Sequence, residues 1–176
     1  LERLAPRVFS DEKPVRTWTF HPVPGLPVSD NPFGVRPRTS TDKNPDATFW
    51  DSIVGGESKT GLLRSQVFDL PPSFSFWICG HNGNPGSKEA PVNHARLILA
   101  SSGEEIAREI PPRKDTAQKV TWTLDAHAGQ AVRMEIVDAH QGGSYAWIGV
   151  GRFHPPVVAA PEAGPSADDG DLLELI

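Results

Sequence analysis

The sequence predicts an all-β protein, an antiparallel β-sandwich or jelly roll of about eight strands. Three observations support this fold class. Short runs of alternating apolar and polar residues recur about every 8–12 residues. The 18 prolines and 16 glycines among 176 residues divide the chain into short segments joined by turns. No stretch shows helical periodicity of useful length.

The N-terminal half is expected to contain the first strands. Residues 17–23 (TWTFHPV) alternate and predict a strand, and residues 24–46 form a long connection rich in Pro, Asn and Asp. Residues 49–61 predict a strand or the start of a turn, followed by a glycine-rich bend. Residues 62–70 predict a strand that ends at the two prolines 71–72.

The second half carries the clearest alternation. Its predicted strands are 73–79, 94–100, 105–110, 119–125, 131–138 and 145–153. In the first of these, Phe74, Phe76 and Ile78 share one face, and Trp77 falls on the opposite face. The single cysteine, Cys79, belongs to the same alternating run and is expected to act as a small buried hydrophobe.

Composition predicts one domain with a segment on each side. Residues 17–154 carry the strand pattern, and residues 1–16 are an N-terminal extension with few order signals. Residues 155–176 have the Pro-, Ala- and Asp-rich composition of a linker or tail.

Charge and hydropathy exclude two classes of partner. The formal net charge is −5 and the pI is about 5.6, whereas nucleic-acid binding needs a basic face. Mean hydropathy is −0.35, and no run approaches the roughly 18 apolar residues of a membrane helix. We therefore expect neither a nucleic-acid partner nor a membrane span.

The long connections are expected to meet at one end of the sandwich. If successive strands run antiparallel, their connections alternate between the two ends. One end then collects the connections 50–61, 80–93, 111–118 and 139–145, which are the longest and most polar. Binding residues concentrate on loops held by a rigid scaffold, so this end is the predicted binding site.

The candidate ligand-binding residues are the polar and aromatic side chains of these connections. They are His81, Asn82, Asn84, Asn93, Arg113, Asp115, His140, Gln141 and Tyr145. Their amides, acids and guanidinium suit sugar hydroxyls, which both donate and accept hydrogen bonds. Trp77 or Trp50 is the candidate aromatic platform for the apolar face of a sugar. The alternative is an ordinary loop, since Asn, Gly and Asp are common in any loop.

A structural calcium site is an open alternative for some of the acids. Asp42 and Asp46 are spaced as in the first half of a calcium-binding loop. However, Ala47 and Ile53 stand where an EF-hand has glycine and glutamate. A different oxygen-rich site that uses Asp42, Asp46 or Asp138 is the hypothesis that follows.

Catalysis is not indicated. The sequence contains no Gly-x-Ser-x-Gly nucleophile turn. Glu135 and Asp138 lie on one predicted strand, without a carboxylate partner for glycoside hydrolysis. We predict that the protein is not an enzyme.

Four stretches between about residues 55 and 153 carry a resemblance to a known family. They are TGLLRSQVFDLP, FSFWICGHNG, KVTWTLDAHAGQAVRMEIVDAHQGG and YAWIGVGRF. They resemble a galactose-binding-like jelly roll, the fold of many carbohydrate-binding modules. GHNG, PPRKD and YAWIGVGRF are similar to modules of multidomain bacterial proteins that also carry c-type haem domains. No Cys-x-x-Cys-His motif is present, so this chain itself attaches no haem.

The resemblance implies a non-catalytic carbohydrate-binding module within a larger exported protein, in the periplasm or outside the cell. Its implied partners are a poly- or oligosaccharide and the neighbouring domains of the parent chain. The alternative is an interdomain scaffold that packs on a neighbouring redox or catalytic domain and binds no sugar. A large exposed apolar patch would mark that scaffold.

Overall fold

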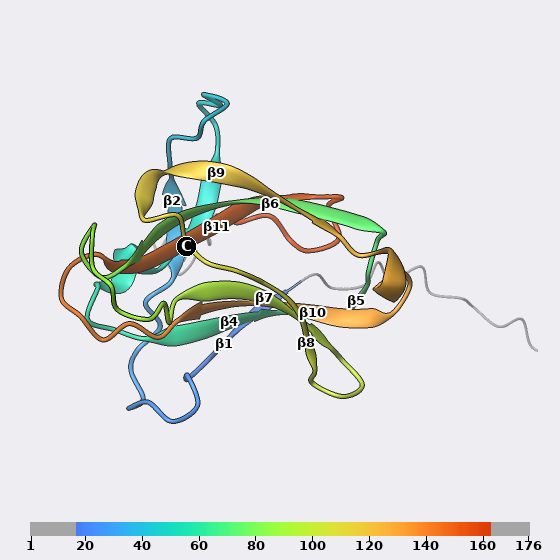
Figure 1. Cartoon of the computed structure of the whole chain (residues 1–176), viewed down its shortest axis with the longest axis horizontal. Helices are drawn as coiled ribbons and strands as arrows, with labels where there is room; N and C mark the ends of the chain where they lie inside the picture. Colours follow the sequence, from blue (N-terminus) through green and yellow to red (C-terminus); the bar gives the residue numbers. More distant parts are fainter. Residues whose placement is uncertain (1–16, 163–176) are drawn as a thin grey trace, which may run out of the picture.

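The computed structural model describes residues 17–162, which form two antiparallel sheets packed face to face (Figure 1). Sheet A has the order β1 (Trp18–His21), β4 (Gly61–Ser65), β10 (Ala131–Asp138), β7 (His94–Leu99) and β8 (Glu105–Glu109), and β5 (Phe68–Asp69) also pairs with β10. Sheet B has the order β2 (Gly34–Pro37), β3 (Thr48–Asp51), β11 (Ala146–His154), β6 (Ser73–Asn82) and β9 (Lys114–Thr123). The helical elements of the described residues are the short 3-10 turns η1 (Ser52–Gly55) and η2 (Asp125–His127). The all-β sandwich prediction is confirmed.

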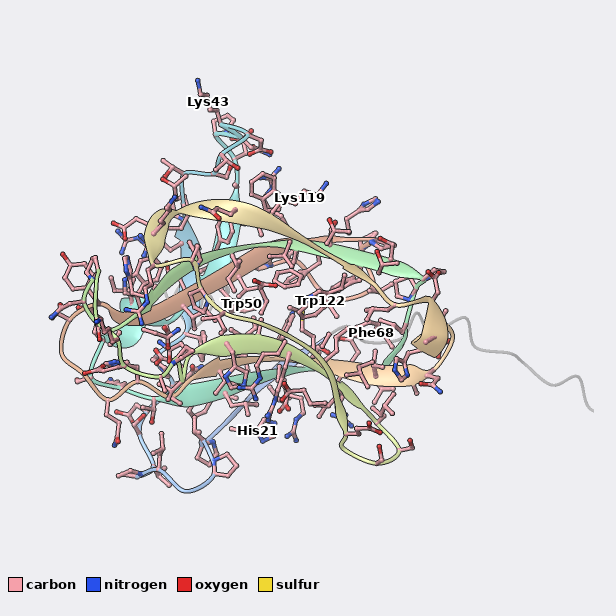
Figure 2. The ribbon with its side chains drawn as sticks, in the orientation of Figure 1. His21, Lys43, Trp50, Phe68, Lys119 and Trp122 are labelled. Carbon is pink, nitrogen blue, oxygen red and sulfur yellow. The ribbon has the colours of Figure 1, made fainter. Side chains whose placement is uncertain are left out.

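The main core lies between the sheets, where the predicted alternation places it. Phe74, Phe76 and Ile78 of β6 point inward and are at most 2% exposed. They meet the inward side chains of β10, which are Val132, Met134 and Ile136. Trp122 of β9 closes this core with its ring edge-on to Phe76, at a centroid distance of 4.7 Å. Figure 2 shows Trp122 and Phe68 in the layer between the two sheets.

Sheet B also buries side chains on its outer face. Phe49, Trp77, Cys79 and Trp147 form a second apolar cluster there. The connection between β2 and β3 lies against this face, and its Ser40 forms a β-bridge with Ala117 of β9. Trp77 is thus opposite the core-facing side chains, as predicted. Burial raises the pKa of Cys79 to about 12, so it stays a thiol and behaves as the expected small hydrophobe.

Several strands differ from the sequence-based prediction. The predicted strand 62–70 is divided into β4 and β5, which both pair with β10. β2 (Gly34–Pro37) lies inside the predicted connection 24–46. The Pro and Asn residues there are typical of loops, so this short edge strand was not predicted. β6 continues to Asn82 because its last residues pair with the start of β11. β9 begins at Lys114, which pairs with Gly80 beyond an irregularity in the ladder.

The long connections meet at one end of the sandwich, on the left of Figure 1, as the alternation predicts. We call this the loop end. It consists of residues 22–33, 52–60, 83–93, 110–113 and 139–145. The connections 66–67 and 70–72 on either side of β5, the turn 100–104 and the connection 124–130 lie at the opposite end.

The segment after β11 packs against the sandwich up to the last described residue, although composition places residues 155–176 in a tail. Val158 is 2% exposed and belongs to the main core. Trp18 Nε1 donates to the Ala159 carbonyl at 3.0 Å. The predicted N-terminal extension 1–16, and the tail from 163 onward, lie outside the described residues. Within residues 17–162, no helix is long and apolar enough to cross a membrane.

Candidate functional site at the loop end

Two buried asparagines anchor the long loop between β6 and β7. Asn82 ends β6 and Asn93 precedes β7, and both are 0% exposed. The Asn82 Oδ1 atom accepts from the amides of Val92, at 2.9 Å, and Asn93, at 2.6 Å. Its Nδ2 donates to the Asn93 carbonyl at 3.2 Å.

Asn93 ties the same point to two other segments. Its Nδ2 donates to the His81 carbonyl at 3.0 Å. Its Oδ1 accepts from the amides of Ala139, at 2.8 Å, and His140, at 3.0 Å. Asn82 and Asn93 therefore hold loops 83–93 and 139–145 together. Both side-chain amides are buried and bind backbone groups. They therefore hold the loops together and are not open to a ligand, whereas a ligand-binding role is predicted for them from the sequence.

Tyr145 stands at the surface against a buried histidine. Its side chain is 42% exposed, and its ring meets the His81 ring edge-on at a centroid distance of 5.1 Å. The His81 side chain is 4% exposed, and its Nε2 lies 2.8 Å from Oδ1 of Asp115, whose side chain is 73% exposed. A carboxylate oxygen only accepts, so Nε2 carries the proton. The three residues form a fixed group with a ring and a carboxylate open to solvent.

Arg113 connects the start of β9 to the long loop. Its backbone has a φ of 58°, in the left-handed region. Its Nη1 donates to the Asn84 carbonyl at 3.1 Å, and its Nη2 approaches the Glu89 carbonyl at 3.5 Å. The guanidinium thus braces the exposed part of the loop while it stays partly open to solvent.

His140 reaches the same loop from the opposite side. Its Nδ1 accepts from the Gly142 amide at 3.0 Å, which places the ring proton on Nε2. Nε2 then donates to Oε2 of Glu89 at 3.3 Å. Gln141 is exposed on the neighbouring position. Glu89 was not among the predicted residues; its place in the long loop was the available signal.

Neither tryptophan candidate offers an open ring face. Trp77 is 9% exposed, and the Arg152 guanidinium lies 4.3 Å from its ring centroid. Trp50 packs against the main core and meets Trp18 edge-on at a centroid distance of 6.4 Å. Figure 2 shows Trp50 between the sheets. Among the described residues, Tyr145 is the large aromatic side chain that is exposed.

The acids considered for calcium do not converge. Asp42 forms two hydrogen bonds with Arg152, at 2.6 and 2.9 Å, and accepts from the Ser40 hydroxyl at 2.6 Å. These contacts hold the pKa of Asp42 well below its usual range. Asp46 is exposed in the connection between β2 and β3, and Asp138 is buried at the end of β10. Within residues 17–162, no three His, Cys, Asp or Glu side chains gather as a metal site.

Asp138 is instead a buried carboxyl beneath the 139–145 loop. Burial raises its pKa to about 7, against the opposing effects of the Ser52 hydroxyl and the His140 amide. Oδ1 accepts from the His140 amide at 3.3 Å, and Oδ2 has no partner among the described residues. Near neutral pH, this loop therefore rests on a carboxyl that is partly protonated.

Arg38 lies next to this site and was not predicted from the sequence. The Arg38 guanidinium carbon lies 3.8 Å from the ring centroid of Trp147, and Arg38 Nε donates to Oδ2 of the buried Asp51 at 2.6 Å. Trp147 in turn meets His81 edge-on at 5.6 Å. The group around Tyr145 therefore continues onto the outer face of sheet B. Arg38 falls in the predicted connection, where no pattern marked it.

Comparisons with known proteins find similar structures but no similar sequences. No protein-family model matches this sequence, and no curated protein matches it. One similar structure is the K3 cleaved adhesin domain of Lys-gingipain from Porphyromonas gingivalis, with a TM-score of 0.45 and 15% identity over 76% of this chain and 87% of that chain. Another contains CBM51-2, in complex with GlcNAc, and the INT domains of ZmpB from Clostridium perfringens. Its TM-score is 0.36, with 13% identity over 76% of this chain and 28% of that chain. The likeness to modules of c-type cytochrome proteins stays a prediction.

Proposed function

We propose that this chain is a non-catalytic carbohydrate-binding module that binds a glycan at the loop end, around Tyr145. The observation that carries the proposal is the exposed Tyr145 ring, which the buried His81 supports beside the exposed carboxylate of Asp115. Sugars present an apolar C–H face and hydroxyls that both donate and accept. An aromatic ring next to a carboxylate matches both features.

The surrounding loops add further hydrogen-bonding groups. Glu89 offers a carboxylate on a side chain that is 68% exposed, and Gln141 offers an exposed amide. Arg113 has N–H groups beyond the two that bind loop carbonyls. Asn82 and Asn93 contribute by holding the loops in place. Because the site is open, each hydrogen bond replaces one to water, and we expect modest affinity.

A binding screen tests this proposal. The purified chain is titrated with a panel of glycans and polysaccharides, and intrinsic Trp fluorescence is followed because Trp147 contacts His81. We expect saturable binding to one sugar class, at least about tenfold weaker for Tyr145→Ala and Asp115→Asn. The matched control is Asp69→Asn, which changes an exposed acid of β5 at the other end of the sandwich. Its affinity should equal that of the wild type.

The effect of a chelator and a complete absence of binding test two further parts of the proposal. The described acids do not converge on a metal, so a chelator should leave binding unchanged. Loss of binding with the chelator would instead revive the calcium hypothesis. A folded chain that binds nothing across the panel would overturn the carbohydrate proposal. We further propose, from the family resemblance, that the module belongs to a larger exported protein.

A second function, the interdomain scaffold, is favoured by one observation. Six large apolar side chains of the described residues are exposed, and five of them belong to the loop end. These five are Val28, Val54, Val92, Ile110 and Tyr145. A neighbouring domain that packed there would cover them. Hydrogen exchange of this chain alone, compared with the chain joined to its natural neighbours, separates the functions: protection of the loop end supports the scaffold.

A further inference from the structure

A second recess lies on the outer face of sheet A, away from the Tyr145 group. The strand register aligns His21, Leu62, Val137 and His94 in one row across β1, β4, β10 and β7. Figure 2 shows His21 on the outer side of this sheet. A pocket of about 370 Å³ opens over part of this row, a volume that suits a small ligand.

The lining of the pocket combines aliphatic and cationic side chains. Leu62 and Val137 come from the sheet, and Val23 and Val92 from the adjoining loops. None of the lining residues is Phe, Tyr or Trp, unlike the surroundings of Tyr145. The polar lining consists of His94, Arg96 and Arg108. The pocket therefore suits an aliphatic ligand that also carries polar groups.

His94 lines this pocket and has an unused hydrogen-bond acceptor, its buried Nε2. The residue is 8% exposed, and its Nδ1 lies 2.9 Å from the Val92 carbonyl. A carbonyl only accepts, so Nδ1 carries the proton. Burial and the charges of Arg108 and Arg96 lower the pKa of His94, which keeps the ring neutral. Nε2 is then a bare acceptor, and it is buried with no partner in residues 17–162.

The arginines leave a donor for an anionic group. Arg96 is shared between Glu135, at 3.1 Å from its Nη2, and Glu105, at 3.5 Å from its Nη1. Arg108 binds Glu105 through Nε and Nη2. The Nη1 group of Arg108 has no partner in the described part of the chain, and its side chain is 43% exposed. A ligand carboxylate at this position would form a charge-assisted hydrogen bond.

We propose that this pocket binds a small aliphatic carboxylate that carries an N–H or O–H donor beside the carboxylate. The aliphatic part lies against Val23 and Val92, above the nearly buried Leu62 and Val137. The donor binds Nε2 of His94, and the carboxylate binds Arg108. Both the C-terminal residue of a peptide and a 2-hydroxy acid have this chemistry. Nε2 is buried in the free protein, so binding at this atom requires side chains of the lining to move. Val92 and Arg108 border the pocket and are themselves exposed. This proposal does not depend on sugar binding at the loop end.

NMR titration of the whole chain tests the proposal, with the ring signals of His94 as the reporter. N-acetyl-leucine is the probe for a peptide terminus, and 2-hydroxy-4-methylpentanoate is the probe for a hydroxy acid. We expect one of them to bind with a millimolar Kd and to shift the His94 ring signals. 4-Methylpentanoate lacks the donor and N-acetyl-leucinamide lacks the carboxylate. Each should bind about tenfold more weakly.

Two variants locate the site. Arg108→Gln should weaken binding of the better probe by about tenfold, because it removes the charged donor. The matched control is Arg133→Gln, which changes an arginine of β10 outside the pocket lining and should leave the Kd unchanged. Backbone spectra of both variants show whether each is folded. The proposal is overturned if the His94 signals stay unshifted with about 50 mM of each of the two probes. It is also overturned if a truncated compound binds as tightly as the better probe, or if Arg108→Gln keeps wild-type affinity.

Discussion

Replacing the carboxyl of Asp138 with an amide should remove a pH dependence from the folding stability of this protein. Asp138 ends β10 with 0% exposure, and burial raises its pKa to about 7 from 3.8 for the free side chain. The unfolded chain therefore loses this proton near pH 4, whereas the folded chain keeps it until about pH 7. Between these values the folded state binds more protons, so the free energy of unfolding falls as pH rises.

The size of the effect follows from the two pKa values. They differ by about 3, and each unit corresponds to about 1.4 kcal/mol, so the full contribution is at most about 4 kcal/mol. Below about pH 4 both states carry the proton, and above about pH 7 neither does, so the contribution is constant outside this window. Between pH 4.5 and 8 we expect a change of about 3 kcal/mol.

Urea unfolding at pH 4.5 and pH 8, followed by the fluorescence of the five tryptophans, measures this change. The useful quantity is the stability of Asp138→Asn minus that of the wild type, which should increase by about 3 kcal/mol from the lower to the higher pH. The subtraction removes groups common to both proteins, including His94, whose lowered pKa acts in the opposite sense. Asp69→Asn is the exposed control and should show no such increase. A difference that stays constant to within about 0.5 kcal/mol would refute the reasoning, because Asp138 would then be ionised in the folded chain.

Two other substitutions test the supports of the loop end. Asn93 and Asn82 form what we call the asparagine clamp. Asn93→Ala leaves the Ala139 amide without an acceptor and removes the shorter of the two hydrogen bonds of the His140 amide, so thermal denaturation should show a loss of about 3 kcal/mol. A loss as small as that of the exposed Asn84→Ala would contradict a role of the clamp in stability. Gly80→Ala should cost more than about 4 kcal/mol or prevent folding, because its Cβ would lie 2.3 Å from the Trp147 carbonyl oxygen at a φ of 118°. Gly86→Ala is the control at a φ of 90° in open space, and equal losses for both variants would show that the close contact is unimportant.

Side-chain alternation was sufficient to predict the sandwich and its loop end. β10 spans the predicted residues 131–138, since alternate apolar side chains must reach the core. The same reasoning placed Trp77 on the outer face. β2 (Gly34–Pro37) could not be found in this way, because a four-residue edge strand that pairs only with β3 needs little alternation.

The roles of individual site residues were less accessible to sequence reasoning. An asparagine in a loop has the same signature whether its amide faces water or binds the backbone, and only burial separates Asn93 from Asn84. The direction of Trp50 depended on the register of β3, which has four residues and no pattern of its own. The stacking of Arg38 on Trp147 joins residues far apart in the sequence, so no local motif could indicate it.

The asparagine clamp makes the long loop exchangeable. Asn82 and Asn93 close its base with buried hydrogen bonds, while residues 84–86 and 88–92 between them are exposed. When the base of a loop is closed, substitutions in the loop have little effect on the stability of the sheet that carries it. The segment from 84 to 91 is therefore suited to randomisation in a display library, where new binding specificities could be selected on an unchanged scaffold.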